Sequence, residues 1–177
     1  MKRKFLISLI VLASVTVFSQ NSVSKFAYGI STDFLSVPLN KDLQIRSTNV
    51  YVTYCPIKNL NLKIGYDALL LQDVNQKKYE DQSALLLGAG YTVLRDKTGN
   101  FSTEVFLSGS NGFKKFSSFS NFHTDLGVKF MLLDAFYIGT GVRFNSYDTN
   151  VVFANQTNSA NLFMQLGLQL NIGKNKL

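Results

Sequence analysis

The chain has 177 residues, the size of a single domain, and its formal net charge is +7. Three of the basic residues, Lys2, Arg3 and Lys4, stand together at the N-terminus; without them 15 Lys and Arg face 11 Asp and Glu, a net charge of only +4. Charged residues make up 16% of the chain, below the ~25% of a typical soluble domain, while hydrophobic residues make up 46%. This balance argues against a nucleic-acid-binding protein and is unusual for a cytosolic enzyme.

The N-terminus has the layout of a secretory signal peptide. The basic residues precede an apolar run from Phe5 to Val17, which ends near the small residue Ser19. That run is too short to cross a bilayer as a helix, and no longer apolar run follows it. We therefore expect a signal peptide over residues 1–20 and one domain over 21–177. Cys55 is the only cysteine, so no internal disulfide can form, and we interpret it as a buried thiol.

Taken in chain order, the rest of the sequence alternates between large apolar and polar residues with a period of two, which indicates β-strands. The predicted strands are 25–34, 48–55, 60–70, 83–94, 101–109, 122–132, 136–145 and 161–172. The last is the clearest, because every even position from Leu162 to Ile172 is a large apolar residue. Many of these runs approach the ~9–11 residues of a tilted strand that crosses a bilayer.

The connections between these strands are predicted to alternate strictly in length. Polar segments 36–47, 72–82, 110–121 and 146–160 are long, whereas 56–59, 95–100 and 133–135 are short. Even strand number, short turns at one end and long loops at the other are typical of outer-membrane barrels. The fold expected is an all-β, eight-stranded antiparallel up-and-down transmembrane β-barrel, with both termini in the periplasm.

The charges within the predicted strands all fall on the less apolar face, which we assign to the lumen. They are Lys25, Asp33, Lys63, Asp67, Glu104, Asp125, Lys129 and Arg143. Outward aromatic residues cluster near both strand ends, as two interfacial girdles would. They are Phe26, Tyr54, Tyr91, Phe101, Phe130 and Phe136 at the periplasmic end, and Phe34, Tyr66, Phe122 and Phe144 at the outer end. A soluble lipocalin-like barrel, with the apolar face inside, is the alternative that this alternation leaves open.

In strand count, loop alternation and face pattern, residues 25–172 resemble the small eight-stranded outer-membrane barrels of the OmpA/OmpX type, in the version found in Bacteroidetes-like Gram-negative bacteria. The resemblance implies a cell outer-membrane location and a fold, but no catalytic activity. It also implies outer-membrane lipid, lipopolysaccharide and the β-barrel assembly machinery as partners, and we expect a monomer.

Inside a barrel of this size, side chains can fill the lumen. We expect Lys63, Glu104 and Lys129 in a lower tier, and Asp67, Asp125 and Arg143 in an upper one, with Asp33 and His123 near the outer mouth. Cross-strand pairs Glu104–Lys129 and Asp125–Arg143 would satisfy the buried charges. The pairs form either a permanent plug or a gate that opens a narrow pore.

Other chemistry has little support in the sequence. His123 and Asp125 share a face and serines are plentiful, so a lipid-modifying enzyme is conceivable, but no spacing signature marks one. One His and one Cys on different strands do not make a metal site, so we expect no metal and no cofactor. In the segment 110–121, Lys114 and Lys115 stand between phenylalanines and could contact lipopolysaccharide phosphates. The functions considered are thus a structural, interaction or adhesion protein, a gated pore, and a lipid-modifying enzyme.

Overall fold

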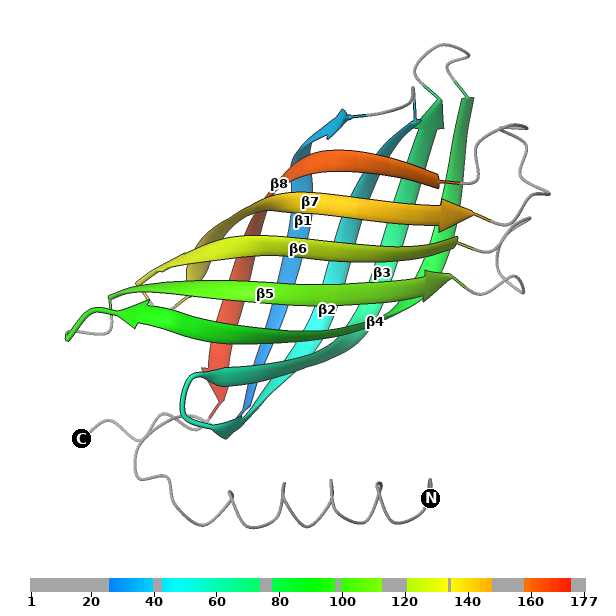
Figure 1. Ribbon diagram of the computed structural model, residues 1–177. Helices are drawn as coiled ribbons and strands as arrows, with labels where there is room; N and C mark the ends of the chain where they lie inside the picture. The colour runs from blue at the N-terminus through cyan, green and yellow to red at the C-terminus, as the bar shows by residue number, and fades with distance from the viewer. Residues whose placement is uncertain are drawn as a thin grey trace, which may run out of the picture.

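The computed structural model describes residues 26–39, 43–73, 78–97, 100–112, 121–133, 135–147 and 158–172, and these form one closed antiparallel barrel (Figure 1). Its strands are β1 (Phe26–Pro38), β2 (Leu43–Ile57), β3 (Leu60–Asp73), β4 (Lys78–Arg95), β5 (Phe101–Gly112), β6 (Asn121–Leu132), β7 (Phe136–Tyr147) and β8 (Asn158–Ile172). Each strand pairs with the next along the chain, and β8 pairs with β1, with Phe26 opposite Ile172 and Ile30 opposite Leu168. The predicted number and order of strands are confirmed.

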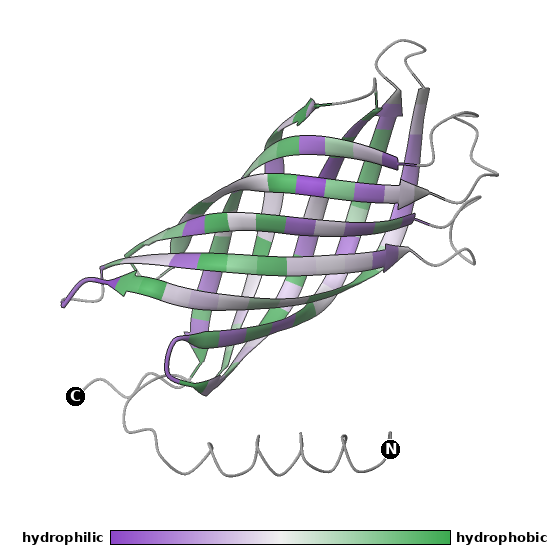
Figure 2. Ribbon diagram, viewed as in Figure 1, coloured by the Kyte–Doolittle hydropathy of each residue, from purple (hydrophilic) through white to green (hydrophobic). Residues whose placement is uncertain are grey.

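The two faces of the barrel are also those that the alternation predicts. Large apolar side chains such as Ile64, Leu107 and Leu126 are about half exposed on the outside, while polar side chains such as Asn49 and Gln165 are buried inside. Figure 2 shows this as bands of opposite hydropathy that alternate along each strand. An apolar exterior around a polar interior is the arrangement of a membrane-spanning barrel. It excludes the soluble lipocalin-like alternative, which needs the apolar face inside.

Both predicted aromatic girdles lie on this exterior. Nine of the ten side chains are exposed, and only Tyr54, which stacks at 5.0 Å between ring centroids on Phe26, is half-buried. The alternation Phe101, Thr103, Val105, Leu107 in β5 predicts all four side chains outward, and for Thr103 this is wrong. Thr103 is buried, at a place where a bulge between Thr92 and Leu94 brings Leu94 opposite it. Among the described residues, no helix is long and apolar enough to cross a membrane.

The strict alternation of long and short connections is not what the structure shows. Segments 36–47 and 72–82 are mostly strand, which leaves only residues 39–42 and 74–77 between β1 and β2 and between β3 and β4. The reason is an inversion of hydropathy along the strands. Beyond about Thr48, apolar residues such as Ile45 and Leu71 point inward, and the polar Arg46 and Asp81 point outward. The alternation thus continues with apolar residues inward and polar residues outward, as expected where strands extend beyond the lipid.

Inward apolar side chains of this inverted part form a buried cluster at this end of the barrel, which we call the apolar cap. Its members are buried and come from β2, β3 and β4: Leu43, Ile45, Leu69, Leu71 and Ala84. At the other end, tight turns join β2 to β3 and β6 to β7, with φ values of 70° at Asn59 and 54° at Leu133. Asn tolerates that left-handed conformation, whereas for Leu it costs energy.

Candidate functional site

The barrel interior below the apolar cap is filled by two tiers of polar side chains. Upper and lower here mean nearer to, and farther from, the cap. Strand pairing sets the tiers: Asp125 lies opposite Arg143 on β6 and β7, and Glu104 lies opposite Lys129 on β5 and β6. Alternate residues of a strand point inward, so the two members of each pair lie side by side in the lumen.

Arg143 is the centre of the upper tier. Its guanidinium donates to both carboxylate oxygens of Asp125, from Nε at 2.7 Å and from Nη2 at 2.8 Å. Nη1 crosses the lumen to Asp33 Oδ2 at 2.6 Å. The same oxygen of Asp33 also accepts the backbone N–H of Ser47 at 2.8 Å. The guanidinium further lies over the Phe163 ring, 4.9 Å from its centroid. One cation is therefore held by two carboxylates in a fixed fork geometry.

The sequence predicts Asp33 and His123 near the outer mouth, whereas the structure places both in this upper tier. Strands β1 and β2 continue past them, so the apolar cap, rather than solvent, lies beyond. The contact between Asp33 and Arg143 joins strands that are not neighbours, and no cross-strand rule could have found it.

Three buried residues of the upper tier form a Ser–His–Asp array. His123 Nδ1 lies 3.2 Å from Ser110 Oγ, and His123 Nε2 lies 3.3 Å from Asp67 Oδ2. The Ser47 hydroxyl donates to the other oxygen of Asp67. The order of groups is that of a nucleophile, a base and an orienting acid. However, none of Ser110, His123 and Asp67 is more than 1% exposed, so this arrangement gives a substrate no access to the serine.

The lower tier surrounds the pair Glu104–Lys129, whose Oε1 and Nζ atoms are 2.9 Å apart. Glu104 also accepts a hydrogen bond from the Asn61 amide, and Lys129 donates to Gln169 Oε1 at 3.3 Å. Lys63 lies in this tier without a carboxylate partner among the described residues. Its Nζ donates to Asn49 Oδ1 at 3.3 Å and lies 4.0 Å from the centroid of the Tyr51 ring.

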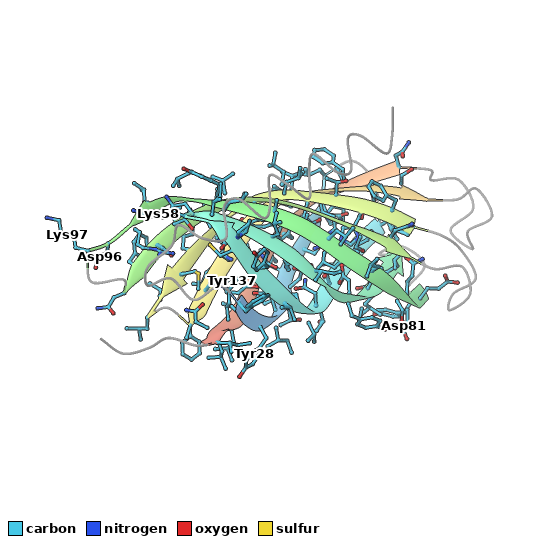
Figure 3. The ribbon with its side chains drawn as sticks, turned by 90° about the horizontal axis from the view of Figure 1, so that it is seen from below. Tyr28, Lys58, Asp81, Asp96, Lys97 and Tyr137 are labelled. Atoms are coloured by element: carbon cyan, nitrogen blue, oxygen red, sulfur yellow. The ribbon has the colours of Figure 1, made fainter. Side chains whose placement is uncertain are left out.

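Two tyrosines belong to the lower tier, where the ammonium groups of Lys63 and Lys129 lie over the rings of Tyr51 and Tyr137. Tyr51 donates a hydrogen bond to the hydroxyl of Tyr137 at 3.0 Å across the lumen. Figure 3 shows Tyr137 inside the barrel and Tyr28 on its outside. The rings have room because glycines lie beneath them: a Cβ at Gly29 would be 2.5 Å from Tyr51 Cζ, and one at Gly167 would be 2.3 Å from Tyr137 Cζ.

A small cavity remains beside the lower tier. It has a volume of about 30 Å³ and is lined by Tyr51, Lys63, Glu104, Lys129 and Tyr137, among others. That is space for about one or two water molecules. The section above it is filled, because Arg143 and Phe163 are each only 1% exposed. The lumen in this state is plugged.

Of the other residues singled out in the sequence, several lie outside the described residues. These are the signal segment 1–20, Lys25, Lys114 and Lys115. Cys55 is a buried free thiol whose Sγ lies 3.1 Å from the carbonyl oxygen of Ile57. Among the residues that the structure describes, no group of three or more His, Cys, Asp or Glu side chains could hold a metal ion.

The fold and the filled polar lumen define the class of this protein as a closed, eight-stranded antiparallel barrel that spans a membrane. Among solved structures, it is similar to Neisserial surface protein A (NspA), with a TM-score of 0.52 and 11% sequence identity over 86% of this chain and 100% of the NspA chain. At this identity the likeness concerns the fold alone. No family model matches the sequence. No curated protein matches it either.

Proposed function

We propose that this chain is a structural and surface-interaction barrel of a bacterial outer membrane, an adhesion role included, rather than an open channel. The observation that carries this proposal is the plugged lumen, in which Arg143, Asp33 and Asp125 form a buried cross-barrel contact beneath the apolar cap. A solute would have to break these charge pairs and displace the cap. The barrel then serves to hold its connections at the membrane surface, where loops can make contacts.

Several features support the outer membrane as the location. A secretory signal pattern precedes strands that alternate, and the barrel shares its fold with NspA, a surface protein by its name. The first and last strands end at the side of the tight turns, as Phe26 opposite Ile172 shows. With that end in the periplasm, the connections 113–120 and 148–157 would face outward. We further propose lipopolysaccharide contact through Lys114 and Lys115, recognition by the β-barrel assembly machinery, and a monomeric state.

Planar-bilayer recording of the purified protein tests the central claim. We expect no single-channel events from protein whose folding is shown by a heat-dependent shift in gel mobility. Fractionation of cells should place the chain with outer-membrane markers. Regular conductance steps from fully folded protein would contradict a permanently closed barrel, and recovery in the soluble periplasmic fraction would contradict the location.

A narrow gated pore is the second candidate, because the cavity lies directly at the Glu104–Lys129 pair. Glu104→Ala leaves Lys129 buried without its carboxylate partner, so we expect a looser lower tier and a lower unfolding temperature. If this tier is the gate, brief conductance events should appear in the variant. Gln169→Ala is a matched control, since it removes a neutral partner of Lys129. Unchanged heat stability and no conductance in Glu104→Ala would argue against a gate at this pair.

A further inference from the structure

The charged side chains that line the cavity of the lower tier do not balance. They are Lys63, Lys129 and Glu104, so two ammonium groups face one carboxylate and one positive charge is in excess. The excess belongs to Lys63, because both oxygens of Glu104 have other partners. Oε1 lies 2.9 Å from Lys129 Nζ, and Oε2 accepts a hydrogen bond from the Asn61 amide.

Lys63 has no other acid as a partner among the described residues. The next acidic residue on its own strand β3 is Asp67, four positions along, so about 13 Å of strand separates the two backbones. Asp67 belongs to the upper tier, where its carboxylate contacts Ser47 and His123. A partly buried ammonium group without a counter-charge is costly, and a bound anion would offset that cost.

The two ammonium groups reach this cavity from strands that are not neighbours, β3 and β6, and each lies over a tyrosine ring. Lys63 Nζ is 4.0 Å from the centroid of the Tyr51 ring, and Lys129 Nζ is 5.2 Å from that of Tyr137. The two rings are joined by the hydrogen bond between their hydroxyl groups. All four side chains line the cavity, so its wall contains two like charges that repel each other.

Both ammonium groups have N–H donors left for a ligand, since each has three. Lys129 uses two, on Glu104 and on Gln169 Oε1 at 3.3 Å, which leaves one. Lys63 uses one on Asn49 Oδ1 at 3.3 Å; if a second faces the tyrosine ring beneath it, one remains. An anion in the cavity can therefore accept a hydrogen bond from each lysine without breaking a contact that the structure shows.

The size of the cavity selects the class of anion. Its volume of about 30 Å³ is space for about one or two water molecules. A chloride ion is only slightly larger than a water molecule and fits, whereas sulfate and organic anions such as gluconate do not. The buried Ser108 hydroxyl lines the cavity and can donate a further hydrogen bond. Lys63 and Asn61 in the wall are only partly buried, so solvent and its ions can reach the cavity.

We propose that the lower tier binds one chloride ion, held by the ammonium groups of Lys63 and Lys129 and by the Ser108 hydroxyl. The ion balances the excess positive charge and reduces the repulsion between the two lysines. This site goes beyond the proposed function, because a closed surface barrel needs no ion in its lumen. It belongs to the plug and not to a conduction path, since Arg143 and Phe163 fill the section above it.

Chlorine-35 NMR of the folded full chain in detergent micelles tests this inference. We expect the wild-type barrel to broaden the chloride resonance, bromide to compete, and gluconate at the same ionic strength to have no effect. A ligand that binds only the folded state also stabilises it. Replacing gluconate by chloride at constant ionic strength should therefore raise the unfolding temperature by a few degrees in a saturable manner.

Lys63→Met should abolish both effects. It leaves no acid without its partner, so we expect the variant to fold. Lys58→Met removes an exposed lysine at the turn between β2 and β3, at the end of the barrel opposite to Asp81 (Figure 3). It is the matched control and should keep both effects. Ser108→Leu fills the cavity without changing its charge, and it provides the test if Lys63→Met does not fold.

Three results would overturn the chloride site: equal responses of the wild type to chloride and gluconate, a full chloride response in Lys63→Met, or one in Ser108→Leu. Loss of the response in Lys58→Met would also overturn it, because the ion would then bind at the surface. None of these results affects the proposed function, provided that the barrel still inserts into membranes and shifts in gel mobility on heating.

Discussion

At the scale of single residues, Arg143 is the side chain that we expect to contribute most to the stability of the filled lumen. It is buried and holds two carboxylates, Asp33 and Asp125, that lie on strands far apart in the sequence. Substitution by Met keeps the volume but leaves two buried acids without their cation. We expect Arg143→Met to lower the free energy of unfolding by about 3–5 kcal/mol. Urea unfolding in detergent micelles or lipid vesicles, followed by gel mobility, measures the change.

Arg143→Lys separates charge from geometry at this site. Lysine keeps the positive charge but cannot donate to both oxygens of Asp125 and to Asp33 at once. We expect a loss smaller than that of the Met variant. If Arg143→Met were as stable as wild type, the upper tier would not be held by this ion pair, and the plug would have to rest on the apolar cap.

At the scale of an element, the turn between β6 and β7 contains a residue in an unfavourable backbone conformation. Leu133 has a φ of 54° and is exposed, so burial of its side chain does not offset the energy of its left-handed backbone. Glycine adopts that conformation without a Cβ clash. We expect Leu133→Gly to raise the free energy of unfolding by about 1 kcal/mol. The same change at Asn59, in the equivalent turn between β2 and β3, should have a smaller effect, because Asn already tolerates a positive φ. No gain at Leu133 would mean that its side chain is anchored by lipid.

The sequence could predict the number, order and faces of the strands, because period-two alternation in each strand gives all three. It could not predict where β2 begins and where β3 ends. The inward apolar residues Ile45 and Leu71 reverse the expected polarity there, and a search for outward apolar residues reads such stretches as loops. The run Leu43-Gln44-Ile45-Arg46 does alternate with a period of two, but with its apolar residues on the inward face.

The candidate site was predictable only in part, for a similar physical reason. Neighbouring strands place Asp125 beside Arg143 and Glu104 beside Lys129, and register supplies both pairs. Contacts across the lumen, such as Arg143 with Asp33, depend on barrel closure and side-chain length. The sequence predicts His123 too near the mouth, because the strands extend farther beyond it than the outward apolar residues indicate.

At the scale of the whole molecule, the apolar exterior should report the depth of the bilayer. Leu126 lies in the middle of β6 and is exposed outward, while Leu94 lies exposed next to the end of β4. We expect Leu126→Lys to cost about 2–4 kcal/mol and Leu94→Lys about 0–1 kcal/mol. Refolding and unfolding in lipid vesicles measures both. Equal costs at the two positions would indicate that the exterior does not face a hydrocarbon core.

The seam between β1 and β8 has a consequence for how the barrel comes into being. Seven seams join strands that follow one another in the chain, but the eighth joins the two ends of the domain, Phe26 with Ile172. Closing it requires the longest loop closure, so it is expected to be the slow step of folding. Until then, two strand edges stay unpaired and open to wrong partners. A newly made chain therefore stays open to aggregation through its two edges until this last seam forms, even when the other seven seams already exist.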